Sequence, residues 1–157
     1  MIIVGIDAST NRTGYAVIKD DNILEHGVFD LHKNKDTTSR LEEMCSKVLS
    51  ILSEYHPHVV YIEDAWQGNN PKTMKLLMHI IGSVYGWCVS NHIKCVEIIP
   101  SSWRKTIGWD IGKKSRDELK IMSLKYVNDT YGIITTSDDL ADAICIATAG
   151  KILERGK

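Results

Sequence analysis

Blocks of apolar residues near the start of the chain predict three strands. The block at residues 2–6 is rich in β-branched side chains, which suit a packed, pleated surface. Thr13 and Gly14 then predict a short turn, because glycine adopts backbone angles that other residues avoid, and the apolar block at 15–18 predicts an antiparallel strand. A polar turn separates it from a third predicted strand at 23–31. These patterns predict an antiparallel meander.

Helical periodicity begins after the third strand. Apolar residues recur three and four positions apart over 37–55, which predicts a helix with one packed face, and a short apolar strand follows at 59–62. Because a helix precedes that strand, we expect it to pair in parallel with the first strand. A second helix at about 72–91 and a strand at 95–99 continue the pattern. The wide apolar stripe of the second helix predicts core packing, with a self-complementary dimer contact as the alternative.

Glycines and a capping pattern organise the last third of the chain. Gly108 and Gly112 predict a bend between a short helix and a longer one, and Ser115 precedes Glu118 at the spacing of a capping box. A final helix opens at Ser137 and contains several alanines, which would allow it to lie close to a sheet. The order of elements predicts an α/β fold, with a mixed sheet flanked by helices in one domain.

Two carboxylates end predicted strands at the same edge of the sheet. Asp7 follows the first strand directly, and Glu63 follows the strand at 59–62. A carboxylate at the end of a buried strand is costly unless a cation or hydrogen bonds compensate it. Open α/β sheets place their sites at this edge, so we expect Asp7 and Glu63 to converge there. The alternative for Asp7 is a structural role as the cap of a turn. Asp64, if still extended, would point to the opposite face.

Acids also crowd the start of the last helix. Asp139 and Asp142 lie three positions apart and share one face, whereas Asp138 is rotated off that face. The helix dipole favours acids at this position, so each is unremarkable alone. Together with Asp7 and Glu63, however, Asp139 and Asp142 would form a cluster that cannot remain ionised without cations. Oxygen ligands without a competing His and Cys set suit Mg²⁺ or Mn²⁺, and two such ions would activate a water and stabilise the leaving oxygen of a phosphodiester.

Composition limits the classes of partner. The 157 residues carry a formal net charge of -1, which argues against a generally basic surface for nucleic acid. A local basic stretch between Arg104 and Lys125 predicts either a DNA contact or an ordinary solvated helix face. Four cysteines without CxxC spacing favour reduced core thiols. The chain has no run of about 18 apolar residues and no secretory signal, so we expect a cytoplasmic protein without membrane contact.

Three segments, in order along the chain, resemble the acidic motifs of one nuclease family. They are GIDASTNRTGYA, VVYIEDAW and SDDLADAICIA. The ordered set is similar to the RuvC-type Holliday junction resolvases of the RNase H-like (retroviral integrase) superfamily, and the short C-terminus and near-neutral charge look more like the phage-encoded branch. The resemblance covers nearly the whole chain, taken as one domain at 1–157. It implies a five-stranded RNase H-like sheet, with three antiparallel strands followed by parallel ones, flanked by helices.

The resemblance assigns roles to particular residues. Four acids fall on the positions of the family's metal ligands: Asp7, Glu63, Asp139 and Asp142. The resemblance therefore implies two Mg²⁺ or Mn²⁺ ions per active site. Trp66 stands where the family carries an aromatic residue implicated in junction binding, and Ala8 replaces the usual proline after the first acid. The other expected DNA contacts are the loop residue Asn70 and the basic residues Arg104, Lys105, Lys113, Lys114 and Arg116.

The same resemblance implies a homodimer that nicks four-way DNA junctions symmetrically. Metal-dependent hydrolysis would leave 5′-phosphate and 3′-hydroxyl ends without a small-molecule cofactor, in a bacterial or phage-infected host cytoplasm. Other branched DNA, including replication forks, is an expected substrate.

Two alternative functions remain open. A YqgF-type nuclease of RNase H fold, acting on RNA, would share the first motif but fits the EDAW and DDLAD segments less well. A non-catalytic junction-binding protein would not need a complete set of four acids. An actin-like ATPase would need further glycine-rich nucleotide loops and a second domain, for which the chain has no room.

Overall fold

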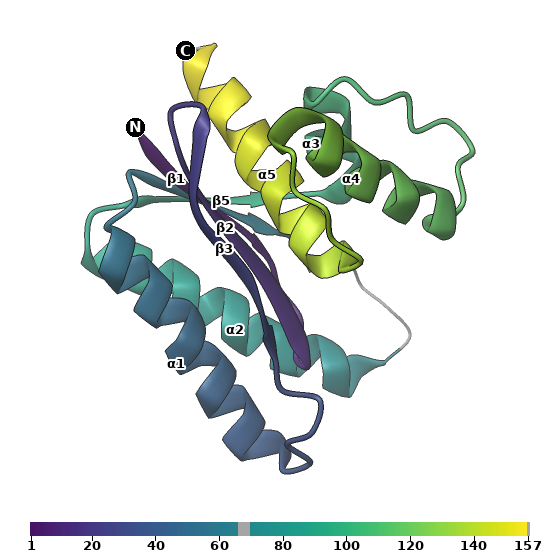
Figure 1. The fold of residues 1–157 in the computed structure, drawn as a ribbon. Helices are drawn as coiled ribbons and strands as arrows, with labels where there is room; N and C mark the ends of the chain where they lie inside the picture. The colour runs from purple at the N-terminus through teal and green to yellow at the C-terminus, as the bar shows by residue number, and fades with distance from the viewer. Residues whose placement is uncertain (66–69, 157) are drawn as a thin grey trace.

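Five strands form one mixed sheet in the computed structural model, which describes residues 1–65 and 70–156 (Figure 1). The order across the sheet is β3-β2-β1-β4-β5, with β1 antiparallel to β2 and parallel to β4. The sequence-based prediction of a mixed α/β sheet is therefore confirmed. The strands are β1 (Ile2–Asp7), β2 (Arg12–Lys19), β3 (Asn22–Asp30), β4 (Val59–Glu63) and β5 (Lys94–Ile98).

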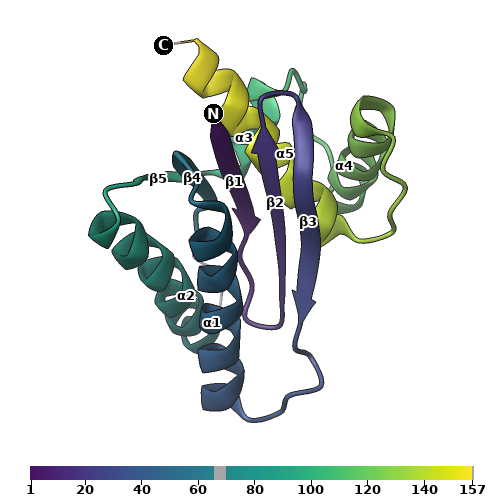
Figure 2. The same cartoon turned by 60° about the vertical axis from the view of Figure 1, so that its left-hand side comes forward.

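Helices cover both faces of the sheet. On one face lie α1 and α2, while α5 crosses the other face with α3 and α4 packed outside it (Figures 1 and 2). The capping box predicted at Ser115 and Glu118 is present and begins α4. The helices are α1 (Thr37–Tyr55), α2 (Pro71–Ser90), α3 (Pro100–Thr106), α4 (Arg116–Tyr131) and α5 (Asp138–Arg155).

Strand alternation divides the core into two. Val4 and Ile6 of β1 are buried against α1 and α2, whereas Ile3 is buried against α5. Because successive side chains point to opposite faces, Asp7 follows Ile3 and Gly5 onto the α5 face. In β4 the same alternation carries Glu63 to that face. The two acids that end these strands are therefore on the side covered by the last helix.

Glycines let α5 lie almost directly on the strands. A Cβ at Gly5 would stand 2.4 Å from the backbone nitrogen of Ala147, and one at Gly14 would stand 2.0 Å from the carbonyl oxygen of Asp139. No larger residue fits at either position without moving the helix. The predicted turn at Thr13 and Gly14 is wrong, because both residues lie within β2 and Gly14 pairs with Asp7. The turn is at 8–11 instead, and Gly14 serves close packing rather than an unusual backbone angle.

The cysteines and the helix lengths agree with the other expectations. All four cysteines are free thiols, with Cys88 and Cys145 buried and the other two partly exposed. Across the described ranges 1–65 and 70–156, no helix is long and apolar enough to cross a membrane.

Candidate active site

A cavity of about 570 Å³ opens where the ends of β1 and β4 meet the start of α5 and one side of α4. All four acids expected at the site line it, together with a fifth acid and three cations. Its lining residues are Asp7, Ala8, Ser9, Glu63, Arg104, Arg116, Leu119, Lys120, Asp138, Asp139 and Asp142. The structure thus brings together carboxylates from two neighbouring strands and from one helix.

The strand acids meet because β1 and β4 are parallel and in register. Ile6 pairs with Ile62, so the next residues, Asp7 and Glu63, end their strands side by side. Burial is the main cause that raises the pKa of Asp7 well above its usual range, and repulsion from Glu63, Asp142 and Asp139 adds to it. The structure gives the Asp7 carboxylate no hydrogen bond or ion pair within the described residues.

Neutral donors hold two of the buried acids. The indole Nε1 of Trp103 donates to Oε2 of Glu63 at 2.8 Å, and the Ser123 hydroxyl donates to Oδ1 of Asp142. Burial raises the pKa of Glu63, and the Trp103 hydrogen bond opposes that rise. Burial likewise raises the pKa of Asp142 against its hydrogen bond from Ser123. Each donor fixes one oxygen of its acid.

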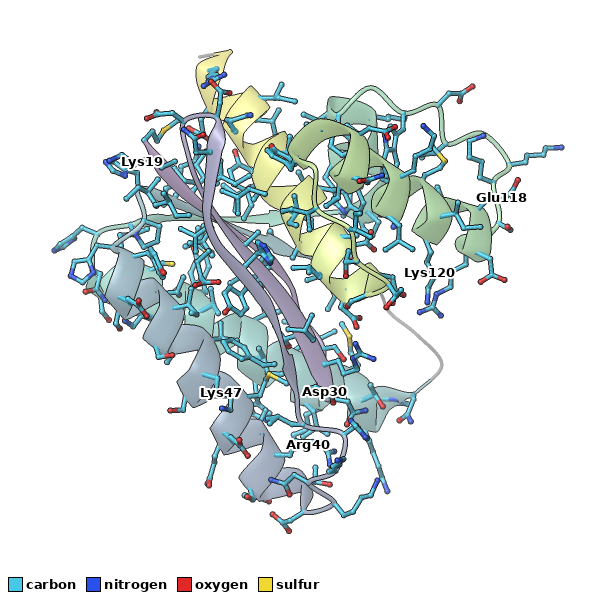
Figure 3. The ribbon with its side chains drawn as sticks, in the orientation of Figure 1. Lys19, Asp30, Arg40, Lys47, Glu118 and Lys120 are labelled. Atoms are coloured by element: carbon cyan, nitrogen blue, oxygen red, sulfur yellow. The ribbon has the colours of Figure 1, made fainter. Side chains whose placement is uncertain are left out.

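Cations accompany the acids of α5. Arg12 Nε lies 3.2 Å from Asp139 Oδ2, and Lys120 forms an ion pair with Asp138. Figure 3 shows Lys120 on the part of α4 that faces the start of α5. Burial raises the pKa of Asp139, helped by the neighbouring charge of Asp138 and opposed by Arg12. Burial also acts to raise the pKa of Asp138, but contact with Lys120 outweighs burial and leaves that pKa lowered.

Arg104 lies between the two sets of acids. Its guanidinium carbon is 4.4 Å from the centre of the Trp103 ring, and its Nη2 is 3.9 Å from Asp142 Oδ2. Its Nε is buried and has no hydrogen-bond partner among the described residues. Stacking therefore holds the guanidinium in place while leaving donors available for an anion in the cavity.

The turn that carries Ala8 and Ser9 is anchored on both sides. The hydroxyl of the buried Thr13 donates to the carbonyl of Ser9 at 2.8 Å and accepts from its backbone N–H at 3.0 Å. Arg40 on α1 donates to the carbonyls of Thr10 at 3.2 Å and Asn34 at 2.7 Å, at the end of the molecule where Figure 3 labels it. The rim of the cavity next to Asp7 is held to the helix beneath the sheet.

The expected basic DNA contacts fall into two groups. Arg104 and Arg116 line the cavity. Lys105, Lys113 and Lys114 are exposed but outside its lining.

Two further DNA contacts, Trp66 and Asn70, were predicted before α2, and the structure describes only Asn70. The side chain of Asn70 accepts hydrogen bonds from the backbone of Lys72 and Thr73 and so caps α2. The predicted stacking residue Trp66 lies outside the described residues.

Sequence reasoning missed several residues that line the cavity or contact its acids. Asp138, expected to be rotated off the face shared by Asp139 and Asp142, nevertheless lines the cavity beside Lys120, so it belongs with the site acids. Lys120 could have been found, since it lies four positions after Arg116 and shares its helix face. The sequence pattern did not single out Trp103, although a buried indole N–H needs an acceptor. Arg12 offered no such pattern, because its contact with Asp139 joins two distant segments.

The donor set suits a hard divalent ion. Among the described residues, no three His, Cys, Asp or Glu side chains stand close enough together to form a complete metal site. Mg²⁺ commonly binds through one or two carboxylates and completes its shell with waters and substrate phosphates. An open cavity with separate carboxylates, in which Asp7 lacks a partner among the residues described, therefore fits such an ion.

The family model and the similar proteins of known name agree on one family. The family model described as "Crossover junction endodeoxyribonuclease RuvC" matches residues 3–149. A protein of that name from Caldicellulosiruptor saccharolyticus is 27% identical over 153 residues, covering 94% of this chain and 90% of the relative. Another from Prochlorococcus marinus is 29% identical over 162 residues, covering 99% of each chain.

Solved structures share the fold. Thermus thermophilus RuvC, in a complex with a Holliday junction substrate, superposes with a TM-score of 0.81 at 16% identity, covering 99% of this chain and 96% of that one. The resolvase of Fowlpox virus, also in complex with Holliday junction DNA, gives a TM-score of 0.67 at 19% identity and covers both chains completely. The RNase H-like arrangement expected from the sequence is confirmed by these likenesses.

Proposed function

The chain belongs to the RuvC family of crossover junction endodeoxyribonucleases, and from this premise we propose that it resolves Holliday junctions by hydrolysing phosphodiester bonds. Residues 1–157 act as one nuclease domain that leaves 5′-phosphate and 3′-hydroxyl ends. The observation that carries the proposal is the convergence of Asp7, Glu63, Asp139 and Asp142 on one cavity with three cations. A protein that only bound junctions would have no use for so many mutually repelling carboxylates.

Four acids would hold the metal: Asp7, Glu63, Asp139 and Asp142. Two Mg²⁺ or Mn²⁺ ions would supply activation of a water and stabilisation of the leaving oxygen. Asp7 is central because it lacks any internal cation in the described part of the chain and gains most from an external one. Trp103 and Ser123 hold their acids in position before substrate arrives.

The cations of the cavity bind the DNA backbone. Arg104, Arg116 and Lys120 come from α3 and α4 and line the same cavity as the strand acids. Cations there hold the phosphate beside the acids and offset negative charge in the transition state. Lys105, Lys113 and Lys114 lie outside the cavity and are suited to the phosphates of the junction arms. Trp66 would stack on an unpaired base. Asn70, which also caps α2, would contact the DNA beside it.

We assign the dimer contact to the outer face of α2. Met78, Tyr85 and Val89 are exposed there, and added Cβ atoms at Gly82 and Gly86 would meet nothing within 4 Å. Small residues between exposed apolar ones allow a second helix to approach closely about a two-fold axis. A homodimer would place two cavities on one junction for symmetrical nicking. Replication forks are further substrates, and the place of action is the cytoplasm of a bacterial or phage-infected cell.

Incubation of a labelled four-way junction with the full chain tests this function. Separate reactions contain Mg²⁺, Mn²⁺ or EDTA, and matched duplex, fork and RNA hairpin substrates are run beside the junction. We expect paired nicks in the junction with either metal, slower cleavage of the fork, and none with EDTA. Ligation of the products without further treatment would report the 5′-phosphate and 3′-hydroxyl ends.

Two results would overturn the proposal. Preferential cleavage of RNA would favour the YqgF-type alternative. Tight junction binding without cleavage in any metal would favour a binding protein.

A further inference from the structure

Trp103 connects the candidate active site to an aromatic cluster behind it. The side chain is completely buried and lies on α3, one residue before Arg104. Its ring meets Trp109 edge-on with centroids 5.7 Å apart, and Trp109 in turn meets Tyr126 at 5.9 Å. The indole is therefore fixed by packing on one side, while its N–H reaches Glu63 Oε2 on the other.

The same ring contacts two groups that line the cavity. Its edge donates to Glu63 at 2.8 Å, and its face carries the guanidinium of Arg104 at 4.4 Å. A residue needed only to fill the core would not require an N–H, because aliphatic and phenyl side chains fill such space without a buried donor. An indole N–H donates and never accepts, so it matches the ionised form of Glu63.

We propose that Trp103 is a positioning residue for metal binding, whose indole N–H fixes one oxygen of Glu63 and leaves the other for a divalent ion. The inference rests on the proposed function, because it takes Glu63 as a metal ligand. Donors that orient ligating carboxylates commonly change metal affinity by about 10–100-fold when removed. The role belongs to this side chain's chemistry, not to its bulk.

Replacement of Trp103 by 3-benzothienylalanine, in the full chain, separates the two contributions. That analogue has the shape of tryptophan with a sulfur in place of the N–H. We expect Mn²⁺ binding, measured by calorimetry without DNA, to weaken about 10-fold. The Mn²⁺ concentration that gives half-maximal junction cleavage should rise by a similar factor, while the rate at saturating Mn²⁺ changes less.

The same replacement at Trp109 is the matched control, since Trp109 belongs to the aromatic cluster but its indole N–H donates to no site residue among those described. Its Mn²⁺ affinity should equal that of the wild type. Trp103→Phe provides a second variant that also lacks the N–H, with thermal unfolding recorded to verify folding. Unchanged Mn²⁺ affinity in a folded Trp103 analogue, or equal losses at both positions, would overturn the inference alone. Absence of Mn²⁺ binding in the wild type would overturn the proposed function as well.

Discussion

The acids from the strands and the acids from the last helix solve the same electrostatic problem differently. On α5, Asp138 is paired with Lys120, Asp139 with Arg12, and Asp142 lies 3.9 Å from Arg104. The strand acids have no such partners within the described residues. Among those residues Asp7 has no hydrogen-bond or ion-pair partner, and Glu63 accepts a hydrogen bond from the neutral indole of Trp103.

This difference follows from where the two groups lie in the fold. The start of α5 is near the surface, so long cationic side chains from β2 and α4 reach it at small desolvation cost. The ends of β1 and β4 are covered by α5 and lie beside other acids, so nothing offsets the charge of Asp7 within the described residues, and only the Trp103 hydrogen bond and the charge of Arg104 offset that of Glu63. The demand for an external cation is therefore concentrated at the strand acids.

Substitution of Asp7 should have the largest effect. Asp7→Asn is expected to reduce Mg²⁺-dependent junction nicking on the order of a thousandfold or more, because the least compensated ligand is lost. Junction affinity in EDTA should stay within a few-fold of the wild type. Asp138→Asn, which removes one charge from the same cavity but an already paired one, serves as the control and should retain most activity. Equal losses in the two variants would contradict the distinction between strand and helix acids.

The pH dependence of stability should show an intermediate effect. The pKa of Asp7 is raised in the folded state, so folding favours the protonated acid and its ionisation destabilises the metal-free protein. The penalty is absent below the ordinary carboxyl pKa and is complete once pH exceeds the raised value. Asp7→Asn should therefore be more stable than the wild type at pH 8, by roughly 1.4 kcal/mol for every factor of ten by which folding weakens the acidity of Asp7.

Urea denaturation in EDTA between pH 8 and pH 5 measures this difference. The advantage of Asp7→Asn should shrink as pH falls through the raised pKa of Asp7, and saturating Mg²⁺ should stabilise the wild type more than the variant. A difference that stayed constant across this range would show that Asp7 ionises normally in the folded protein.

Removal of a helix-side cation should have the smallest effect. Arg12 is half-exposed and competes with an external ion for Asp139, so Arg12→Gln should strengthen Mn²⁺ binding about two- to fourfold, within the range of an exposed ion pair. Calorimetry without DNA gives this affinity. Arg155→Gln is the control, because Arg155 forms a comparable exposed pair with Asp21 away from the cavity. Weaker binding in Arg12→Gln would instead assign Arg12 to orienting Asp139.

Local patterns in the sequence were sufficient to predict the main strands and helices and the convergence of the site acids. Apolar periodicity predicted all five strands and the helix at 37–55, and strand ends predicted that Asp7 and Glu63 would meet. These features depend on short segments or on a general rule about sheet edges. The capping box at Ser115 has the same local origin.

Long-range contacts were not accessible in the same way. Gly14 has the same sequence signature whether it forms a turn or accommodates a helix, and only the position of Asp139 distinguishes the two. Ser123 and Trp103 are ordinary helix and core residues until α5 and β4 bring their acceptors to them. Pairing between distant segments depends on packing, which composition and periodicity do not encode.

Because Gly5 and Gly14 carry no side chain, they also determine how rigidly the site acids are spaced. Since α5 rests on the backbone of β1 and β2, the helix acids and the strand acids change their separation only when the helix lifts as a whole. Lifting it would expose the buried residues Ile144, Ala147 and Cys145, and so would require opening one of the two cores. Ions and DNA therefore exchange through the cavity mouth on their own timescale, while the spacing of the ligands relaxes only as slowly as that core opens.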